Sequence, residues 1–279
     1  MGKMRQNNNP AKQLVTKREH IYFALALLSN ALGFIYILVG EKWYWGIFLA
    51  VGLALPSLFM HGLFIASIRV NGIKLSERQF PDTYARIQDI AHRIGIKKVP
   101  NVYVLQSNGV LNAFATRFYR KNYIVLLSSV FELAKENSTH LDFIVAHELA
   151  HIKRGHVNKH MWLGFANLIP FLTRAYSRAC EFTCDRMAYA YTGSKVAATE
   201  GLLILGAGER LYKDVDIEEF IQQSHAEKGF FVWLTKALST HPTLADRIEA
   251  IEQFSGVSSD MDDEVVRLKQ SSLHEGISV

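Results

Sequence analysis

The chain has 279 residues, of which 49% are hydrophobic and 20% charged, and its formal net charge at pH 7 is +5. This length favours one or two domains, and the two cysteines, Cys180 and Cys184, are too few for a disulfide framework and are expected to be reduced. The positive charge is concentrated in residues 1–20, where five Lys and Arg stand against one acid, Glu19. With no basic stripe in the remainder, we expect no nucleic acid partner.

Two apolar runs without Asp, Glu, Lys or Arg follow this basic segment, at residues 21–40 and 43–68. Each is about long enough to cross a bilayer core of roughly 30 Å. The second begins with Trp43, Tyr44 and Trp45, as expected for aromatic residues at a membrane interface. The sequence therefore predicts a transmembrane helical hairpin over residues 21–68, with the lipid bilayer as a partner.

The charges that flank this hairpin predict its orientation. Lys and Arg are abundant before the first run, the linking turn has a single lysine, and Arg69, Lys74 and Arg78 follow the second run. By the positive-inside rule, both ends of the hairpin face the cytoplasm. The domain that follows is therefore expected on the cytoplasmic side.

Residues 69–254 are expected to form this domain, with more helix than strand. Residues 76–96 have apolar side chains at helical spacing, and Gly95 suits the end of a helix. Three β-like runs follow, and the polar segment between the last two favours an antiparallel meander. A capping-box spacing of Thr139 and Asp142 predicts the start of a helix near Thr139. The expected strands are 99–105, 110–116 and 122–129, and later helices are expected at about 176–191, 195–212 and 243–254.

Two further segments complete the predicted organisation. The apolar segment 161–173 has thirteen residues, contains Pro170 and ends before Arg174, so a buried or membrane-skimming segment is favoured over a third span. Residues 255–279 are polar, Ser-rich and acidic, which predicts a flexible tail.

His147, Glu148 and His151 form a His-Glu-x-x-His pattern inside the predicted helix. Side chains four apart on a helix share one face, so both imidazoles can reach one ion with Glu148 beside them. Zinc favours nitrogen ligands and, in catalytic sites, three protein ligands. The pattern also arises by chance, in which case these residues are solvated side chains of an ordinary helix.

The third ligand is not the nearest histidine. The extended pattern HExxHxxGxxH fails, because Arg154 and Val157 occupy the glycine and third histidine positions. His156 is one residue out of register and is expected, like His160, at the surface or an interface.

An acidic pair further along offers the missing ligand. Glu181 can bind zinc, and Asp185, one turn later, can accept a hydrogen bond from the outer nitrogen of a ligand histidine. The alternative for Glu181 is an exposed acid paired with Arg178.

Four motifs follow one another along the chain: LNAFAT (111–116), HELAH (147–151), SRACEFTCD (177–185) and STHPTLADRI (239–248). With the hairpin before them, they make the chain, from about residue 15 to about 252, resemble the HtpX-like membrane zinc metallopeptidases, relatives of the CAAX prenyl endopeptidases. The chain departs from the family at Cys184, where a small residue is usual, and in the shortness of segment 161–173.

This resemblance implies an α+β fold: the transmembrane hairpin, then a mostly helical zincin-type (gluzincin-like) protease domain with a small antiparallel sheet. It implies one zinc ion per chain, held by His147, His151 and Glu181, with Glu148 as general base. It also implies a multi-pass protein of the bacterial cytoplasmic (inner) membrane.

The resemblance extends to the residues that would meet the substrate. His241 and Arg247 are candidates for stabilising the oxyanion of the tetrahedral intermediate, although His241 alternatively precedes a helix started by Pro242, and Arg247 is alternatively an ion-pair partner. Asn112 and Ala113 would belong to an edge strand that binds an extended peptide; the residues alone favour a plain core strand.

The leading hypothesis is therefore a zinc endopeptidase that hydrolyses peptide bonds of membrane or misfolded proteins at the cytoplasmic face, in stress-related quality control. One alternative is a dedicated processing protease of lipidated or signal-like peptides. Another is a catalytically silent membrane scaffold of the same fold, against which the intact Glu148 and ligand set argue.

Overall fold

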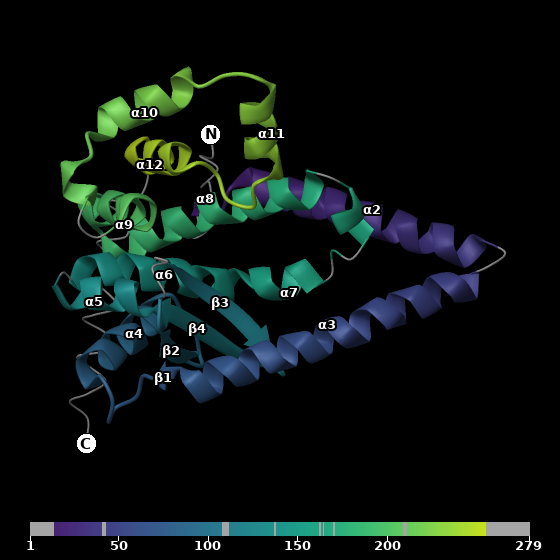
Figure 1. Ribbon diagram of the computed structural model, residues 1–279, viewed down its shortest axis with the longest axis horizontal. Coiled ribbons are helices and arrows are strands. Elements are labelled where there is room, and N and C mark those ends of the chain that lie inside the picture. Colours follow the sequence, from purple (N-terminus) through teal and green to yellow (C-terminus); the bar gives the residue numbers. More distant parts are fainter. Residues whose placement is uncertain are drawn as a thin grey trace, which may run out of the picture.

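The computed structural model describes residues 14–40, 43–107, 112–136, 138–161, 163, 165–169, 171–208 and 211–254. Residues 1–13 of the basic segment and the predicted tail 255–279 lie outside the described residues. Helices predominate, and Figure 1 shows them on both sides of one small sheet. The elements are α2 Lys17–Val39, α3 Trp43–Asn71, β1 Ile73–Lys74, α4 Pro81–Arg93, β2 Asn101–Leu105, β3 Ala113–Phe118, β4 Lys121–Leu127, α5 Ser128–Glu136, α6 Ser138–Arg154, α7 His156–Met161, η1 Phe165–Leu168, α8 Leu172–Thr192, α9 Lys195–Ala207, η2 Tyr212–Asp214, α10 Ile217–Ala226, α11 Phe230–Leu238 and α12 Leu244–Glu252.

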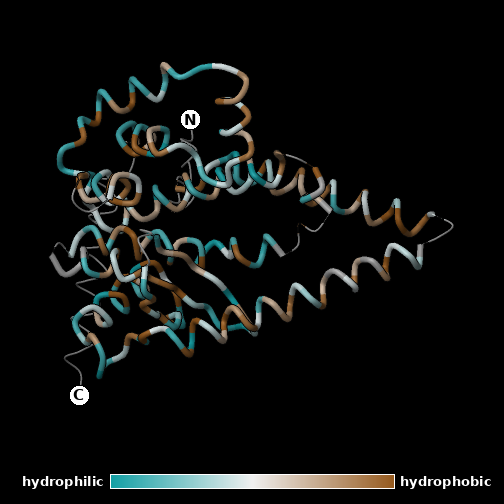
Figure 2. The backbone as a smooth tube through the Cα atoms, viewed as in Figure 1, coloured by the Kyte–Doolittle hydropathy of each residue, from teal (hydrophilic) through white to brown (hydrophobic). Residues whose placement is uncertain are grey.

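Helices α2 and α3 are the two apolar runs. They meet at their far ends and separate toward the rest of the molecule (Figure 1), and residues of hydrophobic type recur along both (Figure 2). Most of their large apolar side chains are exposed. Among the described residues, these two helices are the ones whose length and composition suffice to cross a membrane.

The inner half of each apolar helix packs on a different part of the domain. Helix α2 contacts α8 and η1. Helix α3 contacts the sheet, where Ile65 and Ile68 are buried with Tyr123 and Val125 of β4. The imidazole of His61, in the middle of α3, lies with Nε2 3.0 Å from the Arg117 carbonyl oxygen in β3. The domain thus contacts both arms of the hairpin.

The sheet is mixed, so the prediction of an antiparallel sheet was wrong. Its order is β1-β2-β4-β3, with β2 parallel to β4 and the other two pairs antiparallel. Strand β4 takes the interior place because its run Tyr123–Leu126 is buried on both faces, as expected for continuous apolar strands. One face, with Ile124 and Leu126, joins the main core, and the other packs on α3. Strand β3 is left at an edge.

Helix α6 lies at the centre of the domain. Nearly every residue from His140 to Ala150 is buried, because α6 contacts α4, α5, α8, α9 and β3. Helix α8 packs along it and ends at Gly193, whose φ of 71° lies in the left-handed region that favours glycine. This α6–α8 pair positions the two sequence motifs side by side.

Several element boundaries differ from the prediction. The helix expected over 76–96 begins only at Pro81, because Ser76 and Gln79 pair in a tight turn. The helix expected to reach residue 212 ends at Ala207. Helices α5, α10 and α11 were not predicted; α10 and α11 contain no buried residue, and such short surface helices leave a weak periodic signal.

Segment 161–173 contains no described helix long enough to span a bilayer. Leu163 and Ala166 are instead fully buried together with Ala26 of α2 and Tyr176 and Cys180 of α8. Asn167 and Ile169 are exposed, so the described part of this stretch is buried only in part.

Candidate metal centre

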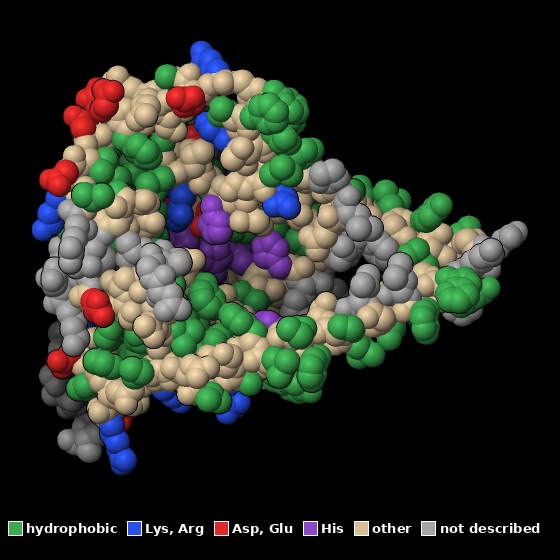
Figure 3. Space-filling view, in the orientation of Figure 1, with side chains coloured by type: hydrophobic (Ala, Val, Ile, Leu, Met, Phe, Trp, Pro, Cys, Tyr) green, Lys and Arg blue, Asp and Glu red, His purple; other side chains and the backbone are tan. Residues whose placement is uncertain are grey.

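A cavity of about 490 Å³ lies between β3, α6, α7, α8 and the segment that leads into α12. Histidine side chains gather in a hollow at the centre of the face shown in Figure 3. The walls include all three members of the His-Glu-x-x-His pattern, together with Glu181, His241, Asn112 and Ala113. Residues that are far apart in the sequence therefore share one cavity.

Three donor side chains converge in this cavity. His147 Nε2 lies 3.2 Å from His151 Nε2 and 3.4 Å from Glu181 Oε2, and His151 Nε2 lies 3.3 Å from Glu181 Oε1. Donors placed tetrahedrally at about 2.0–2.1 Å from a zinc ion lie about 3.3–3.4 Å from one another. The spacing and the two-His, one-carboxylate donor set therefore fit zinc.

Two helices position the donors. The four-residue spacing on α6 places both imidazoles on one face, and α8 packs against that face to bring Glu181 opposite them. Glu181 is buried, so it is not the exposed acid of the alternative interpretation. Arg178 instead donates hydrogen bonds to the carbonyl oxygens of Ala237 and Ser239.

Asp185 and Arg247 support the donors from behind. Asp185 Oδ1 lies 2.9 Å from His147 Nδ1, the nitrogen that faces away from the other donors. Arg247 donates two hydrogen bonds to the same carboxylate, from Nε to Oδ2 at 2.7 Å and from Nη2 to Oδ1 at 2.6 Å. The Arg247 guanidinium is thus engaged as an ion-pair partner, with Nη2 3.6 Å from Glu181 Oε2.

The charges around His147 favour its protonated form when no metal is bound. Burial opposes protonation, but Asp185 and Glu181 outweigh burial and raise the pKa of His147 to about 10. Burial also works against ionisation of Glu181, yet contacts with His147 and His151 keep its pKa well below the usual range. A metal ion entering this site would displace the proton on His147.

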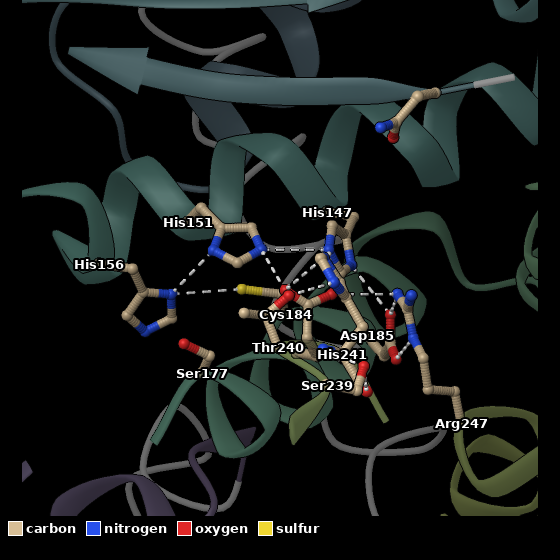
Figure 4. Close-up of polar contacts among 12 residues, drawn as sticks. His147, His151, His156, Ser177, Cys184, Asp185, Ser239, Thr240, His241 and Arg247 are labelled. Atoms are coloured by element: carbon tan, nitrogen blue, oxygen red, sulfur yellow. Dashed lines mark hydrogen bonds and ion pairs between the residues drawn. The ribbon is translucent and has the colours of Figure 1, made fainter. Parts of the chain in front are cut away.

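The substrate-facing candidates lie at the rim of the same cavity. His241, with a side chain 61% exposed, places Nε2 3.6 Å from Glu181 Oε1, and Figure 4 shows it beside the donors. Asn112 lies at the start of edge strand β3, where its side-chain oxygen accepts a hydrogen bond from Ala113 N–H. Its carbonyl oxygen accepts from Leu127 N–H. Both oxygens of Asn112 are therefore engaged within the protein. Its side-chain NH₂ is a better candidate for binding a peptide than its backbone carbonyl.

His156 is buried, and the prediction of a surface or interfacial position was wrong. It is 1% exposed, and its Nδ1 lies 3.1 Å from His151 Nδ1 (Figure 4). On a continuous helix these residues would point about 140° apart, but Gly155 interrupts the helix with a φ of 66°. That break turns His156 toward His151.

Glu19 is the residue at this centre that sequence reasoning missed. Although it stands in the basic N-terminal segment, it is 1% exposed and its Oε1 lies 3.2 Å from His156 Nε2. Arg154 and Lys159 approach the same oxygen, at 2.9 and 3.3 Å. The available signal was a lone acid among five basic residues, directly before an apolar run.

Comparison with known proteins agrees with this geometry. The sequence model of peptidase family M48 matches residues 77–164 and 158–255, which together include the candidate donors, Glu148, His241 and Arg247. No curated protein matches the chain.

Proposed function

Because the chain belongs to peptidase family M48, a family of metallopeptidases that in general depend on zinc, we propose that it is an HtpX-like, membrane-anchored zinc endopeptidase. Its substrates would be membrane or misfolded proteins, cleaved at the cytoplasmic face in quality control. The observation that carries the proposal is the convergence of His147, His151 and Glu181 at zinc-compatible spacing, in a cavity that also contains Glu148.

The residues of the cavity divide the work of peptide hydrolysis. A zinc ion held by the three donors would activate a water molecule and polarise the scissile carbonyl. Glu148 accepts the proton of the attacking water and passes it to the leaving amine. His241 Nε2–H donates to the carbonyl oxygen as negative charge develops there. Its exposure at the rim leaves it accessible to a bound peptide.

Arg247 would act indirectly, without contacting the substrate. Its two hydrogen bonds hold the Asp185 carboxylate, whose Oδ1 lies 2.9 Å from His147 Nδ1 and favours a hydrogen on that nitrogen. This arrangement leaves Nε2 of His147 as the lone-pair nitrogen that faces the metal position. We assign Arg247 to positioning, because Asp185 occupies its guanidinium.

The peptide substrate would lie along β3. This strand forms an edge of the described sheet and contributes Ala113, Phe114 and Ala115 to the cavity wall. An extended peptide can add to such an edge through main-chain hydrogen bonds. The side-chain amide of Asn112 would bind the peptide beside the scissile bond.

Metal removal tests the proposal. The full chain, purified in detergent, is expected to contain about one zinc ion per molecule and to cleave casein. Dialysis against a chelator should abolish both, and stoichiometric zinc should restore cleavage, because the proposed reaction needs a bound Lewis acid. Casein cleavage that persists in the zinc-free protein would contradict the proposal.

The hairpin of α2 and α3 would anchor this protease in the bacterial inner membrane, with residues 69–254 as its cytoplasmic domain. Reporter fusions test this topology: a fusion at Glu41 is expected on the periplasmic side, and fusions after Arg78 and at residue 279 on the cytoplasmic side. The comparison uses alkaline phosphatase, active outside, and a fluorescent protein, active inside. Identical signals at Glu41 and Arg78 would refute the spanning hairpin.

A further inference from the structure

A series of buried side chains in contact with one another connects the N-terminal apolar helix to the metal centre. Glu19, in the first turn of α2, faces His156 Nε2 at 3.2 Å, and His156 Nδ1 faces His151 Nδ1 at 3.1 Å. Glu19 and His156 are each 1% exposed, so water does not compete for these contacts. His151 Nε2, on the opposite side of its ring, is one of the three converging donors.

The role of His151 determines which nitrogen of each histidine in this series carries the hydrogen. A histidine that ligates a metal through Nε2 is neutral and carries its hydrogen on Nδ1. His151 Nδ1–H then donates to Nδ1 of His156, which must act as an acceptor. The remaining hydrogen of His156 is then on Nε2, the ring nitrogen that lies 3.2 Å from Glu19 Oε1.

Cys184 supports the same assignment. Its Sγ lies 3.6 Å from His156 Nδ1 (Figure 4). Burial raises the pKa of this thiol well above the usual range, so it keeps its hydrogen. Two donors therefore converge on His156 Nδ1, which leaves Nε2 as the protonated nitrogen.

Glu19 is held in place from two sides. Arg154 and Lys159, which flank the break between α6 and α7, both contact Oε1. The residue that precedes α2, Thr16, donates from Oγ1 to the Ala179 carbonyl oxygen and from N–H to Thr183 Oγ1. Ala179 and Thr183 flank Glu181 on α8, so the start of α2 is fastened to the helix that carries a metal donor.

We propose that Glu19 and His156 are positioning residues of the metal centre, which orient His151 through the relay Glu19–His156–His151. The inference rests on the proposed function for the identity of the metal. The first turn of the apolar helix α2 then belongs to the zinc site. Glu19 and His156 would orient His151 as Arg247 and Asp185 orient His147.

A second metal ion bound by Glu19, His156 and a cysteine is disfavoured by the same contacts. The donor atoms of Glu19, His156 and Cys180 lie close enough together to hold an ion. However, Arg154 and Lys159 already place two cationic groups within 3.3 Å of the Glu19 carboxylate. Another cation there would meet their charge at close range.

His156→Phe tests the relay, because it keeps a buried ring and removes the acceptor for His151 Nδ1–H. Zinc affinity, measured on the full chain in detergent by competition with a chromophoric chelator, is expected to weaken about 10–100-fold, the usual effect of losing an outer partner of a ligand histidine. Substitution of zinc by Co²⁺ should give an altered visible absorption band. Wild-type affinity with a wild-type cobalt spectrum would overturn the proposal, whatever the change in thermal stability.

Glu19→Gln supplies a second, independent variant. It keeps the side-chain volume and should weaken zinc binding less than His156→Phe does. In the double variant, zinc affinity should equal that of His156→Phe alone, because Glu19 acts through His156. Additive losses would overturn the relay. If His156→Phe yields no folded protein, wild-type zinc affinity and cobalt spectrum in Glu19→Gln would overturn it equally.

His140→Phe is the matched control. His140, on α6, is also a buried histidine paired with a glutamate, Glu200, but it lies about two helical turns before His147. Its loss is expected to leave zinc affinity unchanged. Absence of zinc binding in the wild type would refute the proposed function, whereas tight wild-type binding with unaffected variants would refute the relay alone.

Discussion

Replacing Glu148 by Gln is expected to lower the rate of casein cleavage by about 10²–10⁴-fold, the usual contribution of a general base. The amide keeps the size of the side chain but cannot take a proton from water. Glu148 is not among the three converging donors, so the zinc content should stay at the wild-type value. The measurement is cleavage rate and bound zinc on the same preparation.

Glu132→Gln is the control for this experiment, because Glu132 is an exposed glutamate on α5. It should cleave casein at the wild-type rate. A Glu148→Gln protein that retains full activity would exclude Glu148 as the base. Loss of zinc together with activity would instead show that Glu148 holds the metal.

Replacing Glu181 by Ala is expected to weaken zinc binding by more than about 100-fold, because loss of an outer partner alone costs about 10–100-fold. The variant retains two nitrogen donors, whereas catalytic zinc sites have three protein ligands. Casein cleavage should fall with zinc occupancy and should recover in part at high zinc concentration. Chelator competition measures the affinity, and a zinc titration of the cleavage rate measures the recovery.

Glu200→Ala, which removes a glutamate from the neighbouring helix α9, should leave both quantities unchanged. Wild-type zinc affinity in Glu181→Ala would mean that the third ligand is another residue. His241, 3.6 Å from Glu181 Oε1, would then be the nearest nitrogen donor to consider.

The sequence predicted those parts of the candidate site that depend on residues close together on one helix. The positions of His147, Glu148 and His151 follow from the periodicity of one helix, which any sufficiently long helical segment imposes. The pairing of Glu181 with Asp185 on α8 follows in the same way. Family resemblance, rather than spacing, linked these two helices to His241 and Arg247, because nothing in local periodicity states which helices pack together.

The errors arose where a single contact between distant segments decides the outcome. The antiparallel meander was expected because neighbouring strands often pair, yet β4 lies between β2 and β3, since its apolar run is buried by α3 on one face and the core on the other. His156, one residue out of register with the extended motif, was expected at the surface or an interface, but the break at Gly155 turns it toward His151.

By itself, the sequence determined the two apolar helices, the predominance of helix and the two motif-bearing helices, because composition and helical periodicity act over a few neighbouring residues. Only the tertiary structure decided that Glu19, 132 positions before the candidate zinc ligand His151, lies buried against His156, which contacts that ligand. A carboxylate in a basic segment gives no local sign of burial. Its position depends on the packing of α2 against α8, and on Arg154, Lys159 and His156, which together supply the partners that a buried charge requires.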